Sequence, residues 1–115
     1  MGWLQLSALI MVLTGFTHSF LGETKLIGPL LAIDAPLVQM PLVRKVLRFA
    51  WHLTTLLMFA TALTILWPGT PRAVICLIGG IWFAVGLFDG IFTKGQHVGW
   101  PMLTLAGVAA LIEGV

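Results

Sequence analysis

Charged side chains are scarce in this chain of 115 residues: Asp, Glu, Lys and Arg together make up 9%, where soluble domains carry about 25%. Hydrophobic residues reach 59%, and the mean hydropathy is +1.06. A water-soluble surface cannot be built from this composition, and a chain of this length holds one domain at most. We therefore expect a single integral membrane domain over residues 1–115.

Cysteine is nearly absent as well, since Cys76 is the only one. A single thiol forms neither an intramolecular disulfide nor a cysteine metal cage. The formal net charge is only +2 and no basic run is interleaved with aromatic residues, which argues against a nucleic-acid partner. The sequence shows no recognisable nucleophile, phosphate-binding loop or pair of catalytic carboxylates, so it leans away from an enzyme.

Long apolar runs are abundant, and they predict an all-α membrane protein. The first run has no charged residue and about the 20 residues that a helix needs to cross a hydrocarbon core of about 30 Å. A cleaved signal peptide is disfavoured, because no Lys or Arg precedes the run and no small-residue cleavage site follows it. Residues 68–71, Pro-Gly-Thr-Pro, predict a tight turn and an antiparallel hairpin. The expected helices cover residues 3–21, 43–67, 73–92 and 99–113.

The connection over residues 22–42 is unlike a solvated linker. It is interrupted by Gly28, Pro29, Pro36 and Pro41 but stays apolar, so we expect short helical pieces along the membrane interface. The fourth apolar run is short for a span, and a buried, tilted or half-inserted element is the alternative there. The expected architecture is a four-transmembrane-helix antiparallel bundle with an interfacial loop between its first two helices.

Basic residues are divided unevenly between the two sides of such a bundle. One side carries five of the six, and the other carries only Arg72. Because loops rich in Lys and Arg stay in the cytoplasm, this division predicts a multi-pass protein of the bacterial inner (plasma) membrane with both termini in the periplasm. The five cytoplasmic basic residues are Lys25, Arg44, Lys45, Arg48 and Lys94.

The same side gathers most of the titratable residues, including all three histidines and two of the four acids. Imidazole and carboxylate groups suit Zn, Fe, Ni or Cu, and helical bundles build buried metal sites from ligands on several helices. The candidate metal ligands are His18, Glu23, His52, Asp89 and His97. Alternatively, His18 and His52 hold a haem iron as a bis-histidine pair. The local spacings HExxH, ExxH and HxxxH do not occur, so this hypothesis depends on the inferred depth of the residues alone.

A structural network of ion pairs and hydrogen bonds is the competing interpretation. His18 falls in the last turn of its helix, where the helix dipole favours an imidazolium. Asp89 lies near the end of its helix, where the dipole disfavours a carboxylate, and a charge at membrane depth costs about 2.5–3.5 kcal/mol. Asp89 therefore needs a basic partner, for which Arg48 is the first candidate and His52 the second.

Glycines in the third run predict close helix packing. Gly79, Gly86 and Gly90 fall near one another on a helical wheel, and the last two have the GxxxG spacing that lets helix backbones approach. Trp82 lies mid-helix and is expected to pack in the bundle or against a partner. The other tryptophans cluster near helix ends, as interfacial anchors do: Trp3, Trp51, Trp67 and Trp100.

Two segments carry a resemblance, Thr-His-Ser-Phe-Leu-Gly-Glu at residues 17–23 and Trp-His-Leu-Thr-Thr at residues 51–55. With these, the whole chain resembles small four-helix bacterial inner-membrane proteins that have no assigned activity. The resemblance implies a four-helix membrane architecture and draws attention to His18, Glu23 and His52, but it implies no substrate.

The length and helix count are also similar to those of small multidrug exporters, which use a glutamate embedded in their first helix. The sequence departs from that pattern, because residues 3–21 contain no acid and Glu23 lies outside the run. It also lacks the glycine-rich motif and arginine of small fluoride channels. Three classes remain: a protein that binds a metal ion or haem, an accessory subunit of a larger membrane complex, and a small proton-coupled transporter. The lipid bilayer is the expected surrounding in each, and a homo-oligomer or a larger complex is the expected partner.

Overall fold

The computed structural model describes residues 2–115, and within them it contains helices and turns but no strand. The all-helical prediction is therefore confirmed. In chain order the helices are α1 (Trp3–Gly22), the π-helical segment η1 (Glu23–Ile27), α2 (Gly28–Leu31), α3 (Pro36–Gln39), α4 (Pro41–Leu66), α5 (Arg72–Phe92) and α6 (Trp100–Gly114).

Three helices are long and apolar enough to cross a membrane. They are the continuous helix Trp3–Leu31, with 29 residues, and α4 and α5, with 26 and 21 residues. The fourth long helix, α6, has 15 residues, the same length as the expected helix over residues 99–113, and is short for a full crossing. Composition and helix length together define a helical membrane protein.

The first helix does not end at residue 21 as the sequence predicts. The short helical pieces expected in the connection are present as η1, α2 and α3, but the first two continue the first helix to Leu31. Pro29 has no N–H, and in an α-helix its ring crowds the carbonyl four residues earlier. The π-helical turn η1 widens the helix just before this proline, with the Gly28 N–H bonded to the carbonyl of Glu23 five residues earlier. A Cβ on Gly28 would stand 2.8 Å from that same carbonyl oxygen, so this turn requires glycine.

Arg44 closes the end of this long helix. Its guanidinium donates a hydrogen bond to the carbonyl of Leu31, at 2.5 Å, and so satisfies one of the carbonyls that a helix terminus leaves without a partner. The connection to α4 is thereby shortened to residues 32–40, which include the single turn α3. Pro41 then begins α4, a position that suits a proline because its missing N–H is not needed there.

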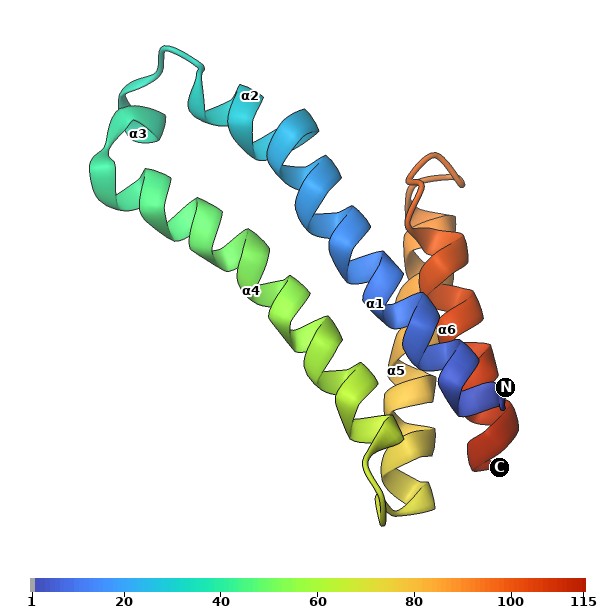
Figure 1. Cartoon of the computed structure of the whole chain (residues 1–115). Coiled ribbons are helices and arrows are strands. Elements are labelled where there is room, and N and C mark those ends of the chain that lie inside the picture. The colour runs from blue at the N-terminus through green and yellow to red at the C-terminus, as the bar shows by residue number, and fades with distance from the viewer. Residues whose placement is uncertain (1) are drawn as a thin grey trace.

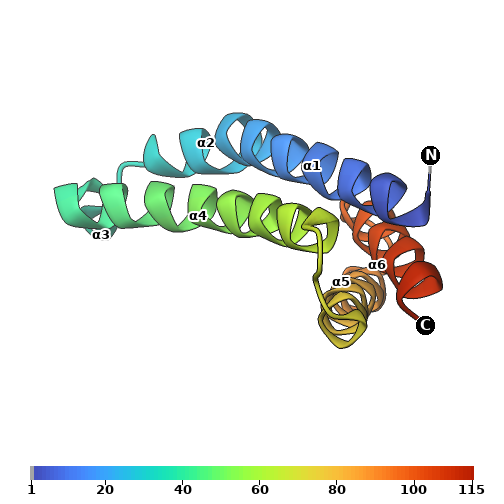
Figure 2. The same cartoon turned by 60° about the horizontal axis from the view of Figure 1, so that its bottom comes forward.

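The helices form two antiparallel hairpins rather than one closed bundle. Figure 1 shows α1 and α2 running beside α4, and α5 running beside α6, with the two hairpins inclined to each other. Figure 2 shows the same separation, and both termini lie at one end of the molecule. The hairpins meet where α1 contacts α6 and where the C-terminal part of α4 reaches α5.

Small residues and two long-range hydrogen bonds hold the hairpins together. Ser7 is fully buried and donates to the carbonyl of Ala106 at 2.7 Å. The Trp82 indole N–H donates to the Thr61 hydroxyl at 3.1 Å, which ties α5 to α4. The core of this junction is formed by Ala8, Met11, Ala62, Ile65, Ile75, Trp82 and Ala106.

The α5–α6 hairpin depends on glycine contacts. A Cβ on Gly86 would overlap the backbone of Thr104, and a Cβ on Gly107 would overlap the backbone of Phe83. Gly79 and Gly90 also lie against α6. All three glycines of the predicted packing face therefore contact a helix of the same chain.

Gly86→Leu is expected to disrupt this hairpin, whereas the same exchange at Gly80 is not. Overpacking costs about 1–3 kcal/mol, and the atoms that the larger side chain would displace at Gly86 include the backbone N and Cα of Thr104. At Gly80, residues 2–115 place no atom within 4 Å of an added Cβ, and replacing a helical glycine gains about 0.5–1 kcal/mol. The free energy of unfolding in detergent, measured for both variants, tests the difference. An equal loss of stability in the two variants would show that Gly86 does not pack more closely than Gly80.

Candidate functional site

The seam between α1 and α4 contains four titratable side chains, His18, Glu23, Arg48 and His52. On the first helix, Ser19 and Glu23 are four residues apart, the spacing that places residues on one helix face, and His18 lies beside them. On α4, Arg48, His52 and Thr55 recur in the same way. Because the helices run antiparallel, Glu23 meets the beginning of this α4 series and Ser19 meets its end.

Glu23 lies between two basic side chains of α4. Its Oε1 is 2.7 Å from Arg48 Nε, and its Oε2 is 4.0 Å from His52 Nε2. Oε2 is buried and has no hydrogen-bond partner among residues 2–115. The Arg48 and Glu23 side chains remain 49% and 35% exposed, so their ion pair is partly screened and modest in energy.

Ser19 continues the contact toward the membrane interior. Its hydroxyl is 2.9 Å from His52 Nδ1 and 2.5 Å from the hydroxyl of Thr55, which is buried. With the contacts of Glu23, these two contacts connect Arg48 to Thr55 through Glu23, His52 and Ser19 in turn. We refer to Ser19, Glu23, Arg48, His52 and Thr55 as the Glu23 network. Every link in it joins α1 or η1 to α4.

His18 has a separate set of partners on the adjacent side of the seam. Its Nε2 is 2.7 Å from the Thr54 hydroxyl and 3.3 Å from the Trp51 carbonyl. The rings of His18 and Trp51 stack, with centroids 4.3 Å apart, and the Trp51 N–H donates to the His18 carbonyl at 2.9 Å. A Cβ on Gly22 would overlap the indole, so glycine makes room for this stack. Trp51 is therefore a helix-packing residue, whereas the sequence suggests an interfacial anchor.

Asp89 and His97 form a third, separate pair within the α5–α6 hairpin. In the turn after α5, Lys94 and Gly95 are both left-handed, and the Gly95 N–H bonds to the carbonyl of Gly90 at 2.7 Å. The Thr93 hydroxyl then accepts from the His97 N–H at 3.3 Å, and His97 Nδ1 lies 2.5 Å from Asp89 Oδ2.

The expected Arg48–Asp89 ion pair is not the arrangement found, and neither is the alternative His52–Asp89 pair. Arg48 and His52 face Glu23 across the α1–α4 seam, while Asp89 receives His97 from its own hairpin. The reason is the angle between the hairpins, which carries the ends of α4 and α5 away from each other on this side of the molecule. Asp89 still has a basic partner, as the dipole argument requires.

The predicted ligand set for a metal ion does not converge. Within residues 2–115, no three His, Cys, Asp or Glu residues lie close enough to hold an ion. His18, Glu23 and His52 lie along one seam, and Asp89 and His97 lie on the other hairpin. A bis-histidine haem site fits no better, because Nε2 of His18 and Nδ1 of His52 are bonded to hydroxyls on opposite helices. The donor groups thus have no common centre.

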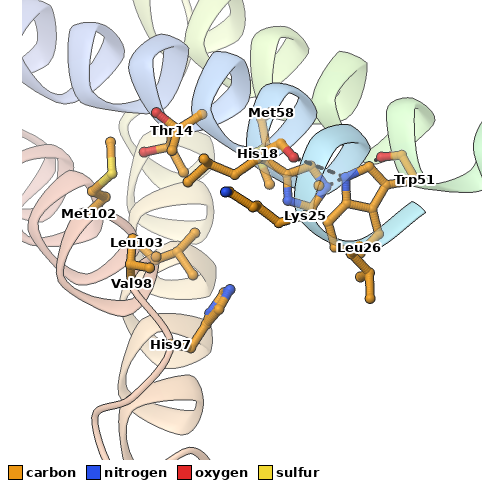
Figure 3. Close-up of a pocket in the computed structure, with 14 residues that line it drawn as sticks. Thr14, His18, Lys25, Leu26, Trp51, Met58, His97, Val98, Met102 and Leu103 are labelled. Atoms are coloured by element: carbon orange, nitrogen blue, oxygen red, sulfur yellow. Dashed lines mark hydrogen bonds between the residues drawn. The ribbon is translucent and has the colours of Figure 1, made fainter. Parts of the chain in front are cut away.

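A cavity of about 320 Å³ lies between the first helix and the beginning of α6. Leu21, Leu26, Met58, Met102 and Leu103 contribute apolar walls, and three ionisable side chains line it as well: His18, Lys25 and His97. Figure 3 shows Lys25 and His97 directed into the cavity from opposite walls. The sequence shows no local signal for this cavity, because three separate segments line it, residues 14–26, Trp51 with Met58, and residues 97–103.

The sequence matches no protein-family model and no curated protein, and the fold matches no solved structure.

Ser19→Ala is expected to lower the free energy of unfolding by about 1 kcal/mol, because hydrogen bonds between membrane helices contribute about 0.6 kcal/mol on average. Ser19 makes two of them. Thr64→Ala is a control, since its hydroxyl bonds back to the Ala60 carbonyl of its own helix.

A double-mutant cycle of Ser19→Ala with Thr55→Val separates the shared hydrogen bond from the other effects of each exchange. Unfolding by denaturing detergent provides the measurement. We expect a coupling energy of about 0.5 kcal/mol. Strictly additive effects would show that the two hydroxyls do not stabilise the seam.

Proposed function

We propose that this chain is a four-helix integral protein of the bacterial inner membrane that acts as an accessory subunit, packing against other transmembrane helices in a larger assembly. The Glu23 network supports this proposal because its polar side chains are engaged in joining the chain's own helices. His18 is engaged in the same way through Thr54 and Trp51. A metal or haem centre has no such support from the donor geometry.

One observation carries the proposal: Gly80 is a helical glycine that the chain's own packing does not use. Gly79 and Gly86 lie against α6, but Gly80 points elsewhere, and residues 2–115 place no atom within 4 Å of an added Cβ. A glycine inside a helix costs about 1 kcal/mol relative to alanine. In membrane helices, small residues four apart let a second backbone come close. Ala84, four residues after Gly80, is exposed. The Gly80–Ala84 face is thus suited to a helix of another subunit.

The positions of the termini support four crossings. The N- and C-terminal ends of the chain lie at one end of the molecule, as an even number of antiparallel spans requires. The 15 residues of α6 extend about 22 Å, which is less than a hydrocarbon core of about 30 Å. Local thinning of the bilayer accommodates a short span of this kind.

Gly80→Leu is expected to release the chain from its assembly without unfolding it. The measurement is native mass spectrometry of protein extracted from its own membrane in mild detergent, with helix content checked by circular dichroism. Wild-type protein should give a mass well above the 12.5 kDa of one chain, and the variant should give the mass of one chain. A multiple of 12.5 kDa would identify a homo-oligomer, and any other mass a complex with a different protein.

Ala60→Leu provides the control for this measurement, because it also enlarges an exposed small residue, but on α4. It should leave the assembly intact. A wild-type protein that is monomeric in its own membrane would contradict the accessory role, as would a Gly80→Leu variant that assembles like the parent. Stoichiometric metal or haem in the purified protein would favour the binding-protein interpretation instead.

Orientation can be tested with reporter fusions at the C-terminus. Basic residues are concentrated at the end where α2, α3 and the α5–α6 turn lie, so this end should be cytoplasmic and both termini periplasmic. An alkaline phosphatase fusion, active only in the periplasm, should be active, and a green fluorescent protein fusion exported through the same translocon should be dark. The opposite pattern would contradict either the orientation or the fourth crossing.

A further inference from the structure

We propose that the cavity between the first helix and α6 binds one anionic phospholipid of the surrounding bilayer, with an acyl chain in the cavity and the headgroup phosphate at Lys25 and His97. The site lies within a single chain, so it is independent of the accessory role.

The position of the cavity suits an acyl chain. The helices α1 and α6 are joined deeper in the molecule by the Ser7–Ala106 hydrogen bond, and they separate toward the α5–α6 turn. The cavity occupies this wedge. Its volume of about 320 Å³ falls at the lower end of the range of about 300–1,000 Å³ that ligand sites have, so it holds part of a lipid rather than a whole one.

The charge of the cavity favours an anion. Lys25, His18 and His97 line it, and within residues 2–115 no acidic residue does. Among residues 2–115, none of the ion pairs involves Lys25. Glu23, two residues earlier, lies on a different side of the helix and is held by Arg48. The Lys25 ammonium is therefore the cation without a protein counter-charge at this site.

His97 is oriented to assist. Its Nδ1 faces Asp89, which fixes the ring and leaves Nε2 as the nitrogen that can meet a ligand. Figure 3 shows the ring directed into the cavity, opposite Lys25. Asp89 itself does not line the cavity. A phosphate between the two side chains would be attracted by the Lys25 ammonium. It would also accept a hydrogen bond from the imidazolium form of His97.

The depth of the site agrees with a lipid headgroup. Lys25 and His97 belong to the end of the molecule where the basic residues gather, and basic pockets between membrane helices on the cytoplasmic side bind anionic headgroups. The rest of the lining is mainly apolar, with Thr14, Thr17 and His18 as its other polar members, as an acyl chain requires and a free phosphate does not. These two features together select an amphiphilic anion over a soluble one.

The experiment is lipid binding to the full-length protein in detergent, followed by native mass spectrometry. Phosphatidylglycerol and phosphatidylcholine with identical acyl chains differ only in headgroup, so their ratio reports charge recognition. We expect phosphatidylglycerol to bind about fivefold more tightly, from roughly one Lys contact. Inorganic phosphate, added as a competitor at the same concentration, should not displace it.

Two variants locate the site. Lys25→Gln should remove the preference for phosphatidylglycerol, whereas Lys94→Gln should not, because Lys94 loses the same charge at the same end of the molecule but does not line the cavity. Met102→Trp should weaken binding of both lipids by filling the cavity. Helix content measured by circular dichroism verifies that each variant is folded.

Several results would overturn the proposal. Equal binding of the two lipids would contradict the headgroup contact. Displacement by inorganic phosphate would show that the site binds a soluble anion instead of a lipid. An equal effect of Lys25→Gln and Lys94→Gln would show general surface attraction instead of a site. The Gly80→Leu variant separates this proposal from the accessory role, since a variant that no longer assembles should still bind the lipid.

Discussion

Polar groups at membrane depth must find their partners inside the protein, because the hydrocarbon offers no water to replace them. This constraint accounts for the seam between α1 and α4. Glu23 meets Arg48, His52 meets Ser19, and His18 meets Thr54. It also accounts for the π-helical turn, which keeps the backbone hydrogen-bonded up to a proline that would otherwise break the helix.

The first helix uses two different means of contact on its two sides. Toward α4 it presents hydrogen-bonding side chains, and toward α6 it presents small residues and the buried Ser7. Small residues let two helix backbones approach closely, but only along the length where both helices carry them. Beyond that length the helices separate, and the cavity forms in the space between them. His18 touches both regions, since it bonds to α4 and lines the cavity.

Some features of the candidate site follow from local pattern, and others do not. The recurrence of small and polar residues at helical spacing indicates which of them share a face, as for Gly79, Gly86 and Gly90. Depth follows from the position of each residue along a span. Rotation about the helix axis does not, because a change of about 100° per residue directs neighbouring side chains to different partners. For this reason the five candidate ligands, expected at one depth, have separate partners.

The sequence by itself determined the helical class, the three long apolar helices and the need of each buried charge for a partner, because these depend on composition and on the local cost of placing polar groups in an apolar medium. Only the tertiary structure decided which partner each charge received and that Gly22–Leu31 continues the first helix. The angle between the hairpins separated Arg48 from Asp89 and opened the cavity at Lys25, whereas the turn after α5 placed His97 at Asp89. That angle arises from packing between residues as far apart as Ser7 and Ala106, which no local pattern contains.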